Sequence, residues 1–238
     1  MNIAKQKYND RAEKINSLLC VGLDPDFEKL PERFKKLKNP QFEFNKWIID
    51  ETHEYVAADK PNMGSYEVRG KDGWEDLQMT MEYLQKNHPD IFTICDAKRG
   101  DIGYTNELYA KAIFDTLGFD AITLHPYLGG EALKPFLDRK DKVSIILCRT
   151  SNPGSPEIQD LKVEGLPAQA GKKLWQIVAE KVSKEWNDNH NCMLVVGATY
   201  PEELGEVRKI VGELTLLVPG IGTQGGSVKE VMERGLNS

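Results

Sequence analysis

Two carboxylates and a lysine stand close together in the segment 96–105, which reads DAKRGDIGYT and follows an apolar run. Asp96 and Lys98 are two residues apart, so in a β-strand their side chains point to the same face. Lys60 ends the preceding predicted strand, and Asp101 follows the glycine at which the chain turns into the next predicted helix. The four side chains would form an alternating array of opposite charges. Such an array holds a lysine ammonium in place and keeps it charged, because neighbouring carboxylates favour the protonated form.

Two simpler interpretations of these residues remain open. Asp101 is of a residue type that caps the first turn of a helix. Asp96 and Lys98 could form a simple ion pair at a strand end, because a lone D-x-K pattern is weak support for a site. The whole pattern D-A-K-R-G-D-I-G-x-T, with a lysine on the preceding strand, is much more specific. We therefore expect Lys60, Asp96, Lys98 and Asp101 to be the catalytic residues.

The segment 219–226, PGIGTQGG, is a second candidate site. It contains G-x-G-x-x-G at Gly220, Gly222 and Gly225, between a predicted strand and a predicted helix. The dinucleotide-binding fingerprint requires a further strand that ends in an acidic residue about 20 positions later. The 238-residue chain has only 13 residues after Gly225. A glycine-rich loop after the seventh barrel strand typically binds phosphate through backbone N–H groups, so we favour phosphate, with the Gln224 amide in reach of the phosphate or a ring.

The segment 149–171, RTSNPGSPEIQDLKVEGLPAQAG, is a long connection in which we expect no helix before about Gln169. Connections of this length are uncommon in compact domains and are usually functional, so we interpret it as a lid. Ser151 and Asn152 at its start are placed to hydrogen-bond an amide-bearing ring. His125, in LHPYLGG, has no partner at metal-ligand spacing, and we interpret it as a wall residue at a strand end.

Short apolar runs alternate with amphipathic segments along the whole chain. The runs are apolar nearly throughout, which is typical of strands covered on both faces. The predicted strands are residues 17–24, 56–62, 91–98, 121–127, 143–150, 192–199 and 214–220. Helical spacing of apolar residues appears in 41–55, 74–87, 108–117, 169–187 and 202–211. Strands that alternate with helices predict a parallel sheet with helices outside it.

Polar residues follow nearly every predicted strand, and this distribution indicates the type of sheet. They include Asp24, Lys60, Asp96, Lys98, His125, Arg149 and Thr150. In a (β/α)8 TIM barrel, the carboxyl ends of the strands carry the active site, whereas an open doubly wound sheet concentrates ligands at one switch point. We therefore predict an α/β protein with a single TIM-barrel catalytic domain over residues 1–238.

The predicted barrel lacks one strand. A (β/α)8 barrel needs eight strands, and no eighth strand is recognisable before the final residues ERGLNS. The natural protein could continue beyond Ser238, the first strand could be miscounted, or the barrel could be open. We expect the first of these.

Composition excludes several classes of partner. The formal net charge is −6 with scattered basic residues, which argues against nucleic acid and anionic membranes. The N-terminal residues are polar, and no apolar run reaches the roughly 20 residues that span a bilayer. The cysteines have no C-x-x-C spacing and lie in or beside apolar runs, so we expect buried apolar side chains rather than disulfides or a metal site. The protein is expected to be cytoplasmic.

Seven segments together resemble a known family. They are LLCVGLDPD, DKPN, DAKRGDIGYT, HPYLGG, RTSNPGS, VVGAT and VPGIGTQGG, in this order. The chain resembles the orotidine 5′-phosphate decarboxylases, in particular their bacterial second subfamily, from about residue 17 to 226. The resemblance implies a TIM barrel that converts orotidine 5′-monophosphate to uridine 5′-monophosphate in de novo pyrimidine biosynthesis, without a cofactor or a metal. The family has a phosphate-binding arginine on its eighth strand, and this chain ends before that strand.

The resemblance implies a role for each of several site residues. Asp24 would bind the ribose together with Lys60. Asp96 would lie beside the carboxylate of the substrate, and Lys98 would donate a proton to C6. Ser151 would contact the pyrimidine.

The family resemblance also implies a homodimer with shared active sites. Asp101 and Thr105 would reach into the site of the partner subunit. Pro219, Gln224 and Gly225 would belong to the loop that closes over the ring and the phosphate.

The implied reaction explains why such an array would be needed. Loss of CO2 leaves an electron pair in the ring plane, orthogonal to the π system, so a fixed positive charge must stabilise it. Lys98 would supply that charge and then the proton, and Asp96 could also destabilise the ground state. Two alternatives remain: a Mg²⁺-dependent sugar-phosphate decarboxylase or aldolase of the same barrel group, against which Lys60 and Ser151 argue, and a non-catalytic nucleotide-binding module.

Overall fold

Seven parallel strands form a single sheet whose strand order follows the chain. The computed structural model describes residues 2–164, 169–222 and 224–237. The strands are β1 (Cys20–Gly22), β2 (Ala58–Lys60), β3 (Phe92–Arg99), β4 (Ala121–Leu124), β5 (Val143–Arg149), β6 (Cys192–Val196) and β7 (Leu216–Leu217). Each lies within or overlaps a predicted strand, so the predicted parallel arrangement is confirmed.

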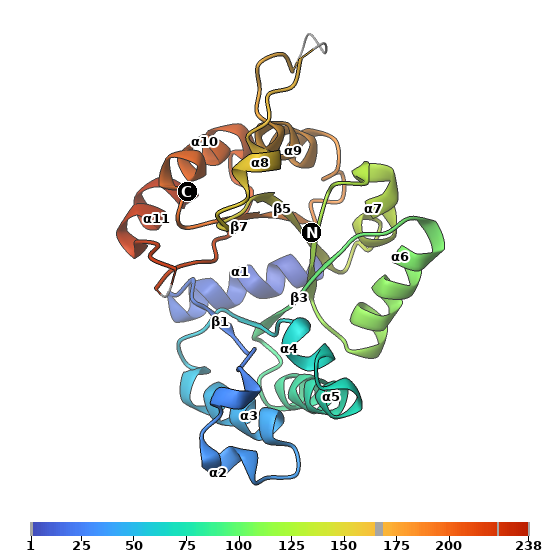
Figure 1. Ribbon diagram of the computed structural model, residues 1–238, viewed down its shortest axis with the longest axis vertical. Helices are drawn as coiled ribbons and strands as arrows, with labels where there is room; N and C mark the ends of the chain where they lie inside the picture. Colours follow the sequence, from blue (N-terminus) through green and yellow to red (C-terminus); the bar gives the residue numbers. More distant parts are fainter. Residues whose placement is uncertain (1, 165–168, 223, 238) are drawn as a thin grey trace.

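Helices surround the curled sheet on its outer side (Figure 1). The longer ones are α3 (Pro40–Thr52), α5 (Gly70–Asn87), α6 (Gly103–Ala110) with its π-helical continuation η2 (Lys111–Thr116), α7 (Gly129–Leu137), α9 (Leu174–Lys184), α10 (Pro201–Val211) and α11 (Val228–Gly235). Short helical turns are η1 (Phe27–Lys29), α2 (Glu32–Lys35), α4 (Gly64–Glu67) and α8 (Pro156–Gln159). β1 and β7 are the two edges of the sheet, and no described residue forms an eighth strand between them. The TIM-barrel class with one strand missing is therefore confirmed.

Both faces of the sheet are buried, which explains why the strands lack polar alternation. Side chains such as Phe92, Ile94 and Ile145 fill the barrel interior. Their neighbours along the strands, such as Cys95 and Ile146, pack in a separate cluster against the helices. Successive residues of a strand point to opposite faces, so two apolar layers require an apolar residue at nearly every position.

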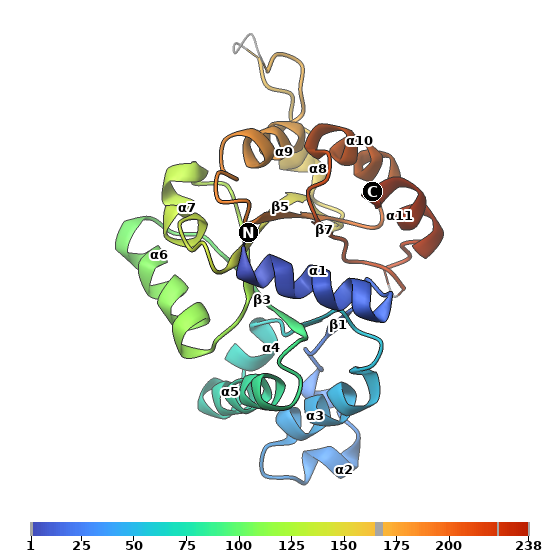
Figure 2. The same cartoon turned by 180° about the vertical axis from the view of Figure 1, so that it is seen from behind.

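A helix that sequence analysis did not predict, α1 (Ile3–Ile15), crosses the barrel at the amino ends of the strands (Figure 2). Ala4 and Tyr8 pack against the interior cluster, and the ring of Tyr8 lies 5.6 Å from that of Phe92. Arg11 donates to the carbonyl of Val56 at 2.8 Å and is buried. The helix needs only a few apolar residues, because only a narrow face of it contacts the end of the barrel. Its apolar periodicity is therefore too weak to predict a helix from the sequence.

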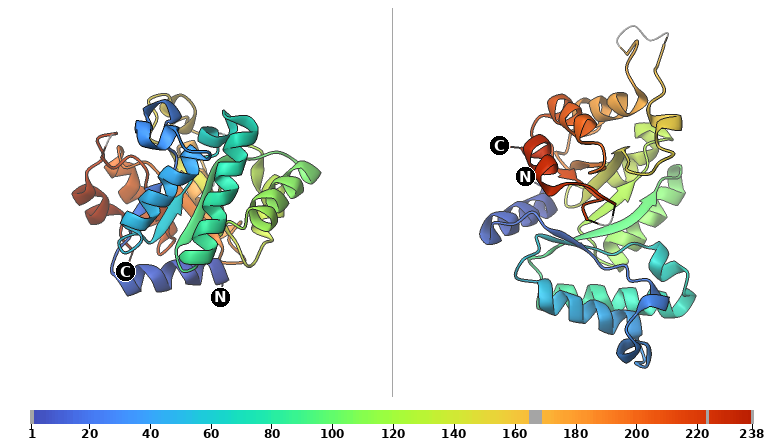
Figure 3. Two further views of the ribbon diagram at one scale, coloured as in Figure 1. Left: turned by 90° about the horizontal axis from the view of Figure 1, so that it is seen from below. Right: turned by 60° about the vertical axis from the view of Figure 1, so that its left-hand side comes forward.

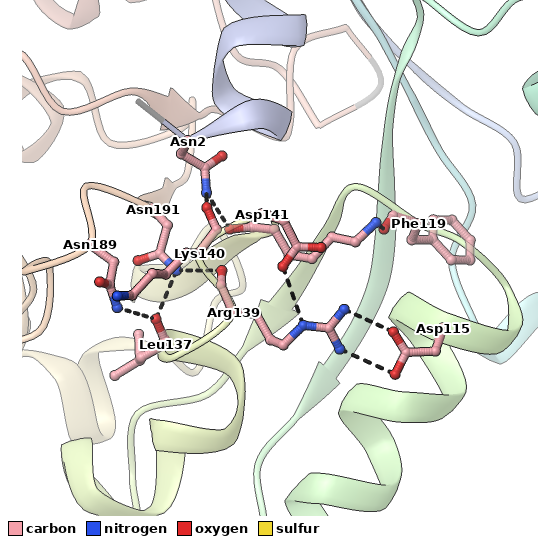
Figure 4. Close-up of polar contacts among 10 residues, drawn as sticks. Asn2, Asp115, Phe119, Leu137, Arg139, Lys140, Asp141, Asn189 and Asn191 are labelled. Atoms are coloured by element: carbon pink, nitrogen blue, oxygen red, sulfur yellow. Dashed lines mark hydrogen bonds and ion pairs between the residues drawn. The ribbon is translucent and has the colours of Figure 1, made fainter.

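Asparagine side chains join the loops at this same end of the barrel (Figure 4). The Asn2 amide donates to the carbonyls of Lys140 and Lys142 at 2.7 and 2.9 Å, while its oxygen caps α1 by accepting from Lys5 N at 2.7 Å. The Asn191 amide donates to the carbonyl of Leu137 at 2.9 Å. These bonds give the loop carbonyls hydrogen-bond donors and tie the loops to α1 and to the start of β6.

The long connection after β5 is more ordered than its sequence indicates. It contains α8, and two of its segments then pair in antiparallel fashion, with Val163 N donating to Lys172 O at 2.9 Å. This paired arm projects away from the barrel (Figures 1 and 3). Residues 165–168 lie outside the described part of the chain, and α9 begins at Leu174 rather than near Gln169. The prediction of an unstructured connection is therefore wrong for its described residues.

The cysteines have the burial that was predicted for apolar core residues. All four cysteines are free, and three of them, Cys95, Cys148 and Cys192, are buried, as predicted for apolar core residues. None of the helices in the described ranges has the length and apolar character needed to cross a membrane.

Asp59 is a buried carboxyl on β2. It is fully buried, and neither of its oxygens has a hydrogen-bond partner among the described residues. Burial raises the pKa of Asp59 to about 7, although Arg11 opposes this shift. A carboxyl with a raised pKa binds its proton more tightly in the folded state than in the unfolded state. Its stabilising contribution is therefore fully present below the unfolded value of 3.8 and is lost as the pH rises to about 7.

We expect Asp59→Asn to stabilise the protein in a pH-dependent way. Because the amide cannot ionise, the variant should be more stable than the wild type at pH 8 by about 1–4 kcal/mol, with a much smaller difference near pH 4. Urea unfolding at the two pH values measures this change. An equal difference at both pH values would show that ionisation of Asp59 is not its cause.

Candidate active site

The carboxylate of Asp96 is the centre of the charged cluster at the carboxyl ends of the strands. Its Oδ2 accepts from Lys60 Nζ at 3.1 Å and from Asn62 Nδ2 at 3.2 Å. Its Oδ1 accepts from Lys98 Nζ at 2.6 Å and from Thr123 Oγ1 at 2.9 Å. One carboxylate therefore holds side chains from β3 itself, from β4 and from the end of β2.

The backbone brings these residues together through parallel pairing and a bulge. Beyond β2, Asp96 N donates to Pro61 O at 2.9 Å, which aligns the end of β2 with the middle of β3. The register between β3 and β4 shifts between Cys95 and Arg99. Lys98 lies within this irregular stretch with a φ of 46°, in the left-handed region that non-glycine residues seldom adopt.

The predicted contact between Asp96 and Lys98 forms, but strand periodicity explains it only in part. In a regular strand, residues two apart share a face. Here the strand is bulged at Lys98, so the contact depends on a local backbone distortion. Lys60, Asp96 and Lys98 are brought together as predicted.

The cluster keeps its charges despite burial. Burial raises the pKa of Asp96, but Lys60, Lys98 and the Thr123 hydroxyl outweigh burial, so that the pKa lies below its ordinary value. Burial lowers the pKa of Lys60, but Asp96 and Asp24 outweigh it and raise the pKa above its ordinary value. Each group is thus held in its charged form by neighbours of opposite sign.

Asp24 lies at the rim of this cluster, just after β1. Burial raises the pKa of its carboxyl, while Lys60 opposes the shift. The preceding residue, Leu23, fixes the backbone at this point. The hydroxyl of Tyr66 donates to the carbonyl of Leu23, and Leu23 N donates to Lys60 O at 3.2 Å.

Asp101 and Thr105 are not brought into the cluster within this subunit. The Asp101 carboxylate accepts from Ile102 N at 2.7 Å. The Asn106 side chain bonds to the backbone of Asp101 twice, because its oxygen accepts from Asp101 N and its amide donates to Asp101 O. Among the described residues, no ion pair joins Asp101 to Lys60 or Lys98. The N-cap position of α6 belongs to Ile102, so Asp101 is not the capping residue. Thr105 lies half-buried in the first part of α6.

The loops that follow β5 and β7 meet at the carboxyl ends of the strands, while their predicted contacts with a ring stay a prediction. Ser151 Oγ donates to Gln224 Oε1 at 2.9 Å, which links the segment after β5 to the segment after β7. Pro219 O accepts from Ala198 N at 2.8 Å. The segment after β6 also lies close to Ser151, because a Cβ on Gly197 would lie only 2.8 Å from the Cα of Ser151.

The glycine-rich loop needs its glycines for backbone conformation. Gly220, Gly222 and Gly225 have φ values of 101°, 85° and 85°, which glycine adopts without a steric penalty. The loop leads into α11, whose N-cap is Ser227. The choice between phosphate and a dinucleotide for this loop stays a prediction. Thr223 lies outside the described residues.

Asn62 and Thr123 belong to the cluster but were not predicted from the sequence. Asn62 stands two residues after Lys60, and Thr123 stands two residues before His125, but neither residue type by itself signals a site. His125 Nε2 lies 2.9 Å from the carbonyl of Gly100, as expected of a wall residue at a strand end. No group of three or more His, Cys, Asp or Glu side chains in the described ranges could hold a metal ion.

The fold and the cluster define a class: parallel α/β barrels with a lysine–carboxylate site at the carboxyl ends of the strands. The family model of the "Orotidine 5'-phosphate decarboxylase / HUMPS family" matches residues 17–237. The chain belongs to this family.

Individual relatives agree with the family match. An orotidine 5′-phosphate decarboxylase of Christiangramia forsetii is 48% identical over 234 residues, which cover 98% of this chain and 84% of the relative. The structure of Leishmania donovani OMP decarboxylase has a TM-score of 0.85 at 39% identity and covers 100% of this chain and 86% of its own. The structure of L. donovani UMP synthase has a TM-score of 0.88 at 41% identity, and the match spans 99% of this chain but 49% of that chain.

We expect Asp96→Asn to destabilise the fold. The change leaves the Lys60 and Lys98 ammonium groups without their shared carboxylate, which should lower the free energy of unfolding by about 1–4 kcal/mol. Asp101→Asn is the matched control and should change it by less than about 0.5 kcal/mol, because an amide oxygen can still accept from Ile102 N. Urea unfolding at pH 7 measures both. An Asp96→Asn protein more stable than the wild type would mean that the cluster stores unfavourable energy.

Proposed function

We propose that this chain decarboxylates orotidine 5′-monophosphate to uridine 5′-monophosphate, in de novo pyrimidine biosynthesis in the cytoplasm, without a cofactor or a metal. The observation that carries the proposal is the asymmetric exposure of the charged cluster. The side chains of Asp96 and Lys60 are 10% and 17% exposed, whereas that of Lys98 is 49% exposed. Lys98 is thus the ammonium with space in front of it for a substrate.

The reaction requires such an ammonium. Decarboxylation at C6 leaves an electron pair in the ring plane, which the π system cannot delocalise. A fixed positive charge stabilises this carbanion as it forms, and the same ammonium then donates its proton to C6. Since Asp96 already orients Lys98, little reorganisation is needed when the charge develops.

The neighbouring residues supply substrate binding. Asp24 and Lys60 bind the ribose, and Asp96 lies beside the departing carboxylate. Ser151 and Gln224 exchange their mutual hydrogen bond for bonds to the pyrimidine ring. Binding of the ring in this way uses side chains that are already in place, so little ordering is required.

The glycine-rich loop receives the phosphate. Pro219 and Gly225 belong to this loop, which precedes the amino end of α11 and offers backbone N–H groups. Binding of the remote phosphate supplies energy for positioning the reacting ring.

A homodimer completes the site. Asp101 and Thr105 act in the site of the partner subunit, which agrees with their position outside the cluster of their own subunit. Exposed apolar side chains near them support a contact surface: Ile102, Tyr104, Leu108, Tyr127 and Leu128. Burial of such a surface favours association.

Two alternatives predict different behaviour. A Mg²⁺-dependent sugar-phosphate enzyme of the same barrel group would lose activity in EDTA. A non-catalytic nucleotide-binding module would bind uridine 5′-monophosphate without turning over the substrate. The Lys60–Asp96 ion pair favours the decarboxylase, because it places an ammonium beside the carboxylate that would otherwise be available to a cation.

We expect Lys98→Ala to keep the fold and to abolish release of uridine 5′-monophosphate. Loss of the charge that stabilises the carbanion should reduce kcat by about 10³-fold or more. Lys71→Ala, at an exposed position on α5, is the matched control and should keep wild-type turnover. A spectrophotometric assay of the purified variants, with circular dichroism to confirm folding, measures this. Substantial residual turnover by Lys98→Ala would defeat the assignment.

We expect inactive Asp101→Ala and inactive Lys98→Ala subunits to restore activity when mixed. In a hybrid dimer, one of the two sites combines an intact Lys98 with an intact Asp101, so random exchange should recover about a quarter of wild-type activity. Differently tagged subunits allow exchange to be verified by co-purification. No recovery after verified exchange would argue against a shared site.

A further inference from the structure

The Thr123 hydroxyl on β4 lies between the two residues that define the charged cluster. Its oxygen is 2.9 Å from Asp96 Oδ1 and 3.0 Å from the backbone N of Lys98. The residue is 1% exposed, so its hydroxyl has little access to solvent. A backbone N–H can only donate, so the hydroxyl must accept from Lys98 and direct its single proton to the Asp96 carboxylate.

The backbone of Lys98 needs such a partner. The bulge between Cys95 and Arg99 interrupts the regular ladder of β3 with β4. The backbone of Lys98 has a φ of 46°, in the left-handed region that a lysine seldom adopts. The Thr123 side chain replaces the missing ladder acceptor, so that the backbone N–H of Lys98 has a hydrogen-bond partner.

We propose that Thr123 is a positioning residue for the decarboxylation that we infer above, and that it acts through Asp96 and Lys98 rather than on the substrate. Its hydroxyl makes two hydrogen bonds that together orient Lys98. One holds the backbone N–H of Lys98, and the other holds the Asp96 oxygen that binds the Lys98 ammonium. This inference rests on the proposed function, because it assigns a role within that reaction.

A matched control lies on the neighbouring strand. The Thr93 hydroxyl of β3 donates to Asp120 Oδ2 at 3.0 Å and accepts from Asp120 N at 3.1 Å. Thr93 is also buried, with 3% exposure. Thr93 therefore makes the same pair of bonds, from a threonine hydroxyl to a carboxylate and a backbone amide, but near the amino end of its strand, whereas Thr123 lies near the carboxyl end of β4. A purely structural role would make the two threonines equivalent.

The experiment compares Thr123→Val, Thr123→Ser and Thr93→Val in the full chain. Steady-state kinetics with orotidine 5′-monophosphate measure kcat and KM, and thermal unfolding measures stability. Thr123→Val should lower kcat by about 10- to 100-fold with KM changed by less than about threefold, because a misplaced ammonium loses transition-state stabilisation rather than ground-state binding. Thr123→Ser keeps the hydroxyl and should recover most of kcat. Thr93→Val should lose stability to a similar degree but keep its kcat within about twofold.

Each outcome bears on a separate claim. A wild-type protein that produces no uridine 5′-monophosphate would refute the proposed function itself. An active wild type with an unchanged kcat in Thr123→Val, or a kcat lowered equally in Thr93→Val, would overturn the positioning role. If Thr123→Val does not fold, Thr123→Ala removes the hydroxyl without placing a methyl group against the Lys98 amide and is judged by the same criteria. Failure of both to fold, with Thr93→Val folded, would show that the hydroxyl serves the fold rather than the reaction.

Discussion

The Asp96 carboxylate between two ammonium groups is the interaction on which the site depends. Lys60 and Lys98 each bond to a different oxygen of this carboxylate. The Asp96 carboxylate pairs with both cations, and the more exposed of the two is Lys98. This arrangement explains how the protein can present a charged lysine without an external counter-ion: the counter-charge is built into β3, and the Asn62 and Thr123 bonds keep it from rotating away.

The two ends of the barrel have different tasks. At the carboxyl ends of the strands, the backbone is irregular, with a bulge at Lys98 and left-handed glycines in the loop after β7. At the amino ends, α1 and a set of asparagine-to-carbonyl bonds close the interior. This division is typical of parallel α/β barrels, in which the loops at one end vary with function while the other end provides stability.

The Asp101 carboxylate lies outside the charged cluster of its own chain, which supports the proposed role of Asp101 in the site of a partner subunit. Its carboxylate is turned to its own backbone, and Asn106 fixes the turn in which it lies. A residue with a rigid backbone and a side chain outside its own cluster is suited to act across a contact between copies of the chain. Exposed apolar side chains also occur on α6 and in the turn just before α7, and the proposed dimer would bury them.

The sequence by itself determined the architecture and the charged core of the site. Uninterrupted apolar runs followed by amphipathic helices can only be satisfied by a parallel sheet buried on both faces, and the DAKRGDIG pattern with Lys60 on the preceding strand placed three of the four array members correctly. The tertiary structure alone decided the bulge at Lys98, the roles of Asn62 and Thr123, the packing of α1 and the paired arm after β5. These features depend on contacts between residues far apart in the chain, such as Thr123 with Asp96 or Asn2 with Lys140. Periodicity and local spacing report only which face a residue prefers, so they contain no information about which distant partner will complete its hydrogen bonds.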